Sequence, residues 1–267
     1  MTAVPVRILL HTLAGLTYAL VLGPIVIVVV TAFSPTEFFA FPPPGLSLRW
    51  FETFFANESL RGAFVRSLSL AALSSALATV VGTMAALYIS RRRGWHITLM
   101  QSLFLAPLIF PAIVFGLALL LFYRLIGGVP EFLGLVIAHA ILGTPFVVRS
   151  VSASVLAVDP ALEEASQSLR ASPLKTFRLV TMPLIWPGII SGALFAFILS
   201  LGELNTALFL TGPGVNTLPI EIFSYLQFQG GQLVIAAASA VQVGIIVALV
   251  IAVERVVGLR RIVRTPS

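Results

Sequence analysis

Six long stretches of apolar residues, separated by shorter polar segments, run along the 267-residue chain. A helix needs about 20 mostly apolar residues to cross about 30 Å of hydrocarbon. The predicted spans are residues 8–33, 63–90, 97–122, 133–148, 188–210 and 233–253. These stretches are apolar throughout, whereas the strands of a membrane barrel alternate polar and apolar residues. The pattern therefore predicts an all-α fold, a polytopic membrane helical bundle of about six transmembrane helices.

The composition agrees with a surface that faces lipid. Hydrophobic residues make up 58% of the chain and charged residues 10%, whereas soluble domains average about 25% charged residues. The absence of cysteine excludes disulfides and thiolate-bound metals, and we expect the chain to bind no cofactor. The first apolar stretch is too long for a signal-peptide core and lacks a convincing cleavage site, so we expect it to be retained.

The basic residues are divided unevenly between the two sides of the predicted bundle. With the N-terminus inside, twelve of the sixteen lie in cytoplasmic segments: Arg7, Arg91, Arg92, Arg93, Arg149, Arg170, Lys175, Arg178, Arg255, Arg260, Arg261 and Arg264. The outer side holds the other four: Arg49, Arg61, Arg66 and Arg124. Because cations collect in cytoplasmic loops, both termini are predicted to be cytoplasmic. The same bias accounts for the net charge of +6 without a nucleic-acid partner.

The first outer loop, residues 34–62, carries three consecutive prolines, followed by Trp50, Phe51, Phe54 and Phe55. The prolines predict an extended backbone. The aromatic residues are expected at the membrane interface, where such side chains anchor membrane proteins. A partner-docking role for this loop is the alternative that the sequence leaves open.

The cytoplasmic stretch of residues 150–186 carries the clearest local signals. Asp159 suits a helix N-cap, Pro160 suits the first helical position, and Glu163 with Glu164 suits the positive end of the helix dipole. Leu162, Ala165 and Leu169 then share one helix face. This face either docks a partner or packs back on the bundle, and Glu164 either contacts the partner or stabilises its own helix.

A second helix start follows within the same stretch. Ser172 and Pro173 repeat the N-terminal signal, and the helix is predicted to run to about Leu179. Pro183 and Pro187 are expected to end it before the fifth span. The sequence thus predicts a pair of short helices that projects from the cytoplasmic side.

At these residues the chain resembles the permease subunits of bacterial binding-protein-dependent ABC importers. Their signature is Glu-Ala-Ala, three residues, Gly, nine residues, then Ile-x-Leu-Pro. The matching positions here are Glu164, Ala165, Ser166, Arg170, Val180, Met182 and Pro183. Arg170 in place of glycine is the main departure. Either Arg170 adopts the left-handed conformation that glycine favours, or the turn is formed differently.

Further segments resemble the polyamine branch of these importers, which has relatives for phosphonate, ferric iron and thiamine. They are residues 46–50, 107–111, 138–139 with 145–146, 200–210 and 217–219. The resemblance implies a single transmembrane domain over residues 1–267, with a coupling loop at about 150–186, in a bacterial inner membrane. It implies import of a small solute, with spermidine or putrescine as the leading candidates.

The resemblance also implies partners: two ATPase subunits that use ATP and Mg²⁺, a second and different but related permease, and an external solute-binding protein. The residues implied to couple to the ATPase are Leu162, Glu163, Glu164, Ala165, Ser166, Leu169, Arg170 and Pro183. The chain has no phosphate-binding loop, since the glycines at 212 and 214 are not followed by the required lysine. It is therefore expected not to be an enzyme.

Three polar residues inside predicted spans are candidates for the translocation path. Glu203 and Asn205 lie in the fifth span and His139 in the fourth. A charge in hydrocarbon is costly, so Glu203 is expected to face a cavity or a partner, where it would attract a cation. Hydrogen bonding to a neighbouring helix is the alternative for each of them. A stand-alone secondary carrier is the competing function class, although one buried acid gives such a carrier little support.

Overall fold

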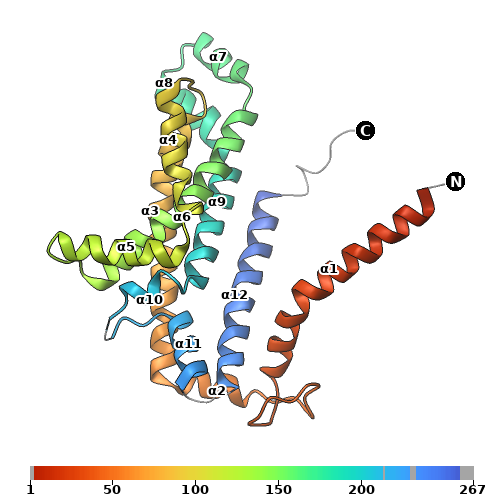
Figure 1. Ribbon diagram of the computed structural model, residues 1–267. Coiled ribbons are helices and arrows are strands. Elements are labelled where there is room, and N and C mark those ends of the chain that lie inside the picture. Colours follow the sequence, from red (N-terminus) through yellow and green to blue (C-terminus); the bar gives the residue numbers. More distant parts are fainter. Residues whose placement is uncertain (1–2, 213, 229–232, 259–267) are drawn as a thin grey trace. The chain divides into compact units, whose positions relative to one another are not determined.

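The computed structural model describes residues 3–212, 214–228 and 233–258, and within that part the regular structure is helical (Figure 1). The long helices are α1 (Ala3–Thr31), α3 (Glu58–Ile89), α6 (Glu131–Ala157), α9 (Met182–Gly202) and α12 (Val234–Val257). The shorter ones are α2 (Arg49–Ala56), α4 (Trp95–Leu105), η1 (Ala106–Leu108), α5 (Ala112–Leu125), α7 (Pro160–Ser168), α8 (Pro173–Thr176), η2 (Phe177–Thr181), α10 (Ala207–Leu210) and α11 (Leu218–Phe228). The predicted all-α class is confirmed.

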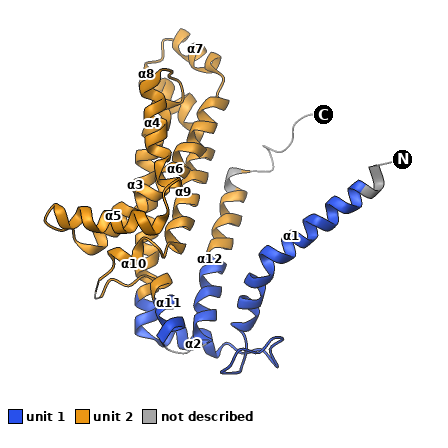
Figure 2. Ribbon diagram, in the orientation of Figure 1, with its two compact units in different colours: residues 1–62, 221–245 blue, residues 63–220, 246–267 orange. Residues whose placement is uncertain are grey.

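The chain divides into two compact units, coloured separately in Figure 2. Unit 1 comprises residues 1–62 and 221–245, and unit 2 comprises residues 63–220 and 246–267. The candidate docking and path residues all belong to unit 2. Arg260, Arg261 and Arg264, which were predicted to be cytoplasmic, lie outside the described residues.

Within the described residues, five helices are long and apolar enough to cross a membrane, and a bent pair brings the total to six. This agrees with the prediction of about six spans. The third span, however, is not the single helix predicted for residues 97–122. Trp95–Leu108 and Ala112–Leu125 meet at 104°, because Pro111 precedes α5 with an extended backbone (ψ 128°) and supplies no N–H to continue the helix.

The fifth span also differs from its predicted bounds of 188–210. Its helix runs from Pro173 to Gly202 without a stop at Pro183 or Pro187, so the expectation that these prolines end the second loop helix is wrong. Pro183 follows the π-helical turn η2, and Pro187 lies inside α9. Proline is tolerated in membrane helices because neighbouring helices and local π-helical turns satisfy the backbone groups that it leaves unpaired. The docking loop is therefore continuous with span 5.

The core of unit 2 is the crossing of α6 and α9. Its buried members include Val147, Val151, Val155, Ile185, Ile189 and Ala196. Glycines allow the close approach: a Cβ on Gly192 would lie 2.8 Å from Cα of Val147, and one on Gly143 would lie 2.9 Å from Cβ of Ala196. Small residues at such crossings let helix backbones pack closely in membranes. This crossing supports the loop between the two helices.

In unit 1, the outer loop is more ordered than its prolines predict. Residues 49–56 form α2, in which Trp50 and Phe54 are buried. The Trp50 indole donates a hydrogen bond to the carbonyl of Thr36 at 3.2 Å. These two aromatic residues therefore build a small core, contrary to the expectation that they lie at the membrane interface, whereas Phe55 is exposed.

Candidate functional site

The first loop helix begins as the sequence predicts. A side-chain oxygen of Asp159 accepts a hydrogen bond from the Ala161 N–H at 2.9 Å, and Pro160 is the first residue of α7. This cap satisfies one of the free N–H groups of the first turn. The helix then extends to Ser168.

Arg170 adopts the left-handed conformation, with φ +61°. Its N–H bonds to the carbonyl of Gln167 at 2.8 Å, and the Ala171 N–H bonds to the carbonyl of Ser166 at 3.2 Å. This paired pattern is the usual way to end a helix at a left-handed residue. Of the two possibilities that the sequence left open, the first is the one observed: Arg170 occupies the position that glycine favours.

The second loop helix is capped and tied to the first. Ser172 Oγ accepts a hydrogen bond from the Lys175 N–H at 3.4 Å, and the hydroxyl groups of Ser166 and Thr176 lie 3.0 Å apart. From Pro173 the helix continues through η2 into α9. A displacement of α8 is therefore a displacement of the start of span 5.

The projecting segment exposes apolar side chains. Leu169 is 85% exposed, Leu174 67% and Leu179 66%, while Leu162 is half exposed. Ala165 and Glu164 are also exposed. Neither leucine of the predicted face is packed back into the bundle within this chain, which leaves the face available to a partner. An adjacent cleft of about 430 Å³ is lined by Ser172, Leu174, Lys175, Arg178 and Leu179.

The Glu163 side chain accepts three hydrogen bonds. Both of its carboxylate oxygens accept from the Arg91 guanidinium, one of them from Nη2 at 2.9 Å, and Oε1 also accepts from the Thr181 hydroxyl. Hydrogen bonding to Arg91 holds the pKa of this carboxyl below its ordinary 4.5, against the raising effect of partial burial. The contact stabilises the loop at neutral pH and is lost only as the pH falls through that depressed pKa.

The sequence identified Glu163 as a coupling residue but gave it no partner, because 72 residues separate it from Arg91. The sequence feature that pointed to this partner was charge. Arg91 is the first of three arginines that follow the second span, on the same predicted side of the membrane as Glu163. Pro183, the last of the predicted coupling residues, lies in the first turn of α9.

The structure places His139 in the protein interior. It is 2% exposed, and its Nδ1 lies 2.8 Å from Ser200 Oγ, which also accepts a hydrogen bond from Ser74 at 3.0 Å. The contact joins α3, α6 and α9. This is the cross-helix hydrogen bonding that the sequence left as the alternative to a place in the path.

Glu203 and Asn205 lie where the fifth span is interrupted. Helix α9 ends at Gly202, and α10 begins at Ala207. Between them, Glu203 Oε1 accepts from the Thr206 N–H at 2.9 Å, and Asn205 is exposed. Glu203 is partly exposed. It lies 64 residues from His139 along the chain, and no hydrogen bond among the described residues joins His139 to this segment.

The interruption of span 5 meets the interruption of span 3. The Thr206 hydroxyl donates to the carbonyl of Ala112, the first residue of α5, at 3.2 Å. Gly116 allows this approach, since a Cβ there would lie 2.9 Å from Cα of Thr206. Irregular backbone at membrane depth occurs where it is buried in protein or lines a cavity. The two breaks therefore meet beside the Glu203 carboxylate.

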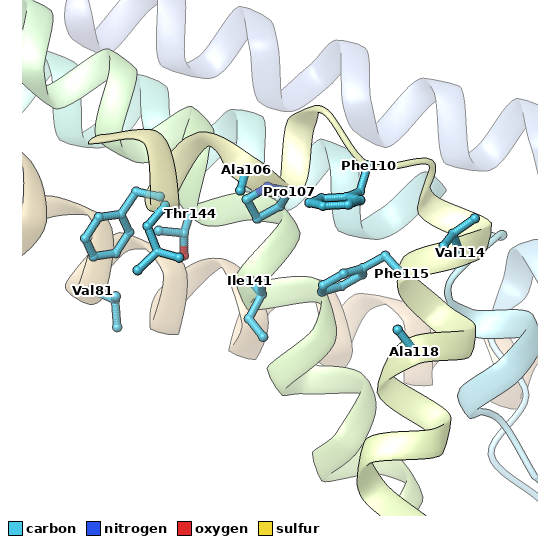
Figure 3. Close-up of a pocket in the computed structure, with 11 residues that line it drawn as sticks. Val81, Ala106, Pro107, Phe110, Val114, Phe115, Ala118, Ile141 and Thr144 are labelled. Carbon is cyan, nitrogen blue, oxygen red and sulfur yellow. The ribbon is translucent and has the colours of Figure 1, made fainter. Parts of the chain in front are cut away.

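A separate apolar hollow of about 550 Å³ lies along the bend of the third span (Figure 3). Its lining residues are Val81, Leu103, Phe104, Ala106, Pro107, Phe110, Val114, Phe115, Ala118, Ile141 and Thr144. Thr144 supplies the one side-chain hydroxyl among them, and its Oγ1 already donates to the carbonyl of Ala140. The hollow therefore suits apolar contacts and not a charged solute.

No group of three or more His, Asp or Glu residues in the described part of the chain could hold a metal ion.

The comparisons with known proteins agree with this arrangement. The family described as binding-protein-dependent transport system inner membrane component matches residues 78–258. The putrescine transport system permease protein PotI of Escherichia coli strain K12 is 36% identical over 189 residues, which cover 67% of this chain and 66% of that protein. The match therefore spans just under two thirds of the length of that relative.

Two further relatives show how broad the likeness is. The spermidine/putrescine transport system permease protein PotC of the same strain is 29% identical over 210 residues, covering 79% of each chain. The molybdenum transport system permease protein ModB of Mycobacterium bovis is 31% identical over 205 residues, covering 70% of this chain and 78% of that protein.

Solved structures share the fold. A bacterial ABC transporter involved in the import of alginate matches with a TM-score of 0.67 at 18% identity, over 97% of this chain and 95% of that one. A methionine ABC transporter in inward-facing conformations matches with a TM-score of 0.62 at 19% identity, over 76% and 98%.

Proposed function

Because the chain belongs to the family of binding-protein-dependent transport system inner membrane components, we propose that it forms one half of the transmembrane pathway of an ATP-driven importer in the bacterial inner membrane. A second, related permease supplies the other half. Two ATPase subunits bind on the cytoplasmic side and use ATP and Mg²⁺, and an external binding protein delivers the solute. This chain itself neither hydrolyses ATP nor holds a cofactor.

The observation that carries the proposal is the projecting pair α7 and α8. Both helices have side-chain caps, the turn between them is formed by hydrogen bonds, and the leucines stay exposed. When a short, well-capped helix exposes an apolar face that does not pack on its own core, that face is available to bind another protein. Leu162, Ala165 and Leu169 supply the apolar contacts, and Glu164 lies exposed beside them.

The cations of this surface specify the partner further. Lys175 and Arg178 line the same cleft as the exposed Leu174 and Leu179, and Arg170 is a third exposed cation of the segment. Asp159 and Glu164 are its exposed acids. Electrostatic complementarity favours an apolar groove with a net acidic rim. The ATPase subunit is expected to present such a groove.

For the solute, we propose a cationic polyamine such as putrescine or spermidine. The names of two similar relatives support this choice, and Glu203 offers a carboxylate beside the meeting point of two interrupted spans. Phosphonate, ferric iron and thiamine importers remain the alternatives within the same class. Uptake of radiolabelled putrescine by the assembled complex, with each of these as competitor, decides between them.

The docking proposal is tested by co-purification of a tagged chain from native membranes in mild detergent. We expect an ATPase of the importer type to accompany the wild-type chain and to be lost with Leu169→Asp. Leu125→Asp is the matched control, since Leu125 is also 85% exposed but lies at the end of α5, and it should retain the ATPase. A wild-type chain that purifies with no ATPase would instead favour a stand-alone secondary carrier.

A further inference from the structure

The docking segment is connected to three spans of unit 2 in three ways. Helix α7 follows α6 after the two residues 158 and 159, and α8 continues through η2 into α9. Helix α3 is not adjacent to the segment along the chain, since it ends at Ile89 and α7 begins at Pro160. Arg91, two residues beyond the end of α3 at Ile89, reaches across to Glu163 on α7.

The geometry of this contact differs from that of an ordinary surface ion pair. Two guanidinium nitrogens engage both carboxylate oxygens, and the Glu163 side chain is only 15% exposed. The buried Thr181 hydroxyl donates to the same carboxylate from η2. A two-pronged arginine–carboxylate contact fixes orientation as well as distance, so one carboxylate holds the end of α3, α7 and the start of span 5 together.

The neighbouring arginines do not share this role. The Arg92 guanidinium lies 3.9 Å from the centre of the Tyr88 ring, on its own segment. Arg93 is exposed and has no hydrogen bond or ion pair with another described residue. The triplet therefore contains one residue that reaches the docking segment and a nearby residue of the same charge that does not.

We propose that Arg91 is a positioning residue that transmits movement of the docked helix α7 to span α3 through Glu163. The inference rests on the proposed docking of an ATPase subunit. Without this contact, motion of the segment still reaches α6 and α9 through the chain itself. Deeper in the bundle, α3 packs on α6 and α9 through Ala78 and Ala86. The Arg91–Glu163 contact adds a direct link between α7 and the end of α3.

The absence of cysteine in the sequence permits a direct test. A fluorophore sensitive to its surroundings is attached in the reconstituted ATPase complex to a single cysteine at Val80→Cys on α3 or at Phe195→Cys on α9. Both positions are more than half exposed in this chain. Addition of Mg²⁺ and ATP should change the signal at both sites. With Arg91→Glu, the change at position 80 should fall by about tenfold while that at position 195 persists.

Charge exchange and a neighbouring charge reversal provide the controls. The double variant Arg91→Glu with Glu163→Arg restores the pair and should recover the response at position 80, whereas Arg93→Glu should leave both responses intact. Three results would overturn the inference: an unchanged response at position 80 in Arg91→Glu, no recovery in the double variant, or dissociation of the ATPase from Arg91→Glu. If neither site responds in the wild-type complex, the proposed function itself is wrong.

Discussion

At the scale of single residues, the feature with a measurable cost is the left-handed Arg170. An L-residue with a Cβ costs roughly 1 kcal/mol in this conformation relative to glycine. The cost is offset by the hydrogen bonds that end α7, which need φ +61° at this position. The residue also adds an exposed cation to the segment, which glycine would not do.

We therefore expect Arg170→Gly to raise the free energy of unfolding by about 0.5–1 kcal/mol, because relief of strain exceeds the added freedom of the unfolded chain. The measurement is thermal unfolding of the purified protein. Arg170→Ala is the control: it removes the same side chain but keeps the Cβ, so its stability should not rise. Equal gains in both variants would show that the arginine side chain, and not the backbone, is the source of strain.

Glu203 is the second residue whose role can be isolated. Glu203→Gln retains the oxygen that accepts from the Thr206 N–H and removes the charge. If a cation passes this position, putrescine uptake should fall by about fivefold, since a partly exposed ion pair is worth on the order of 1 kcal/mol. Glu37→Gln, at an exposed outer-loop acid paired with Arg49, should leave uptake unchanged. Equal uptake by the two variants would remove Glu203 from the path.

Local rules succeeded where a few consecutive residues supply all the partners. The caps at Asp159 and Ser172 depend on hydrogen bonds within three residues, so the sequence predicts them. The turn at Arg170 is also local, but the sequence left two forms of it open, and the structure shows the left-handed one. The Arg91–Glu163 contact depends on how α3 packs beside the loop. Only its charges, and not their meeting, could be predicted from the sequence.

At the scale of helices, apolar length predicted that the spans exist but not where they break. Pro111 lies at a sharp bend, whereas Pro183 and Pro187 lie within a continuous helix. Proline has both outcomes because it costs the helix one hydrogen bond and a clash of its ring with a carbonyl group. The packing of the surrounding helices decides whether that free-energy cost is tolerated. Element ends near proline are therefore set by tertiary contacts that a hydropathy pattern does not contain.

The α6–α9 crossing makes a testable claim about packing at this scale. Gly192→Ala places a methyl group 2.8 Å from Cα of Val147, and backbone cannot move aside as a flexible side chain does. We expect a loss of about 1–3 kcal/mol, the usual cost of overpacking. Gly244→Ala in α12 is the control, because its Cβ would meet no atom within 4 Å and alanine favours helix. Similar unfolding temperatures for both variants would contradict the crossing as described.

At the scale of the whole molecule, membership of the importer family agrees with what the sequence pattern and the loop signature predicted. The fold of the described residues is shared with importer structures at 18–19% identity. The prediction was possible because apolar periodicity and the capped loop at residues 159–183 depend on local sequence patterns. The proposed solute depends instead on Glu203, whose meeting with the break in span 3 is a tertiary contact that the sequence pattern does not contain.

The orientation of the bundle follows from where the cations gather in unit 2. The contact between Arg91 and Glu163 places the arginine triplet at the same end as α7 and α8, where Arg170, Lys175 and Arg178 also lie. An end so rich in cations is expected in the cytoplasm. We then predict that the loop that holds Phe38 is on the outer side of the membrane, because the span that follows it, α3, is long and apolar enough to cross.

Labelling of single cysteines in intact cells tests this orientation, since the natural chain contains no cysteine. Phe38→Cys, at an 83% exposed position, should react with a membrane-impermeant maleimide from outside. Ser168→Cys, exposed at the end of α7, should react only after the inner membrane is permeabilised. The reverse pattern would place the docking helices outside the cell, where no ATP-driven partner could reach them, and both the orientation and the proposed coupling would fall together.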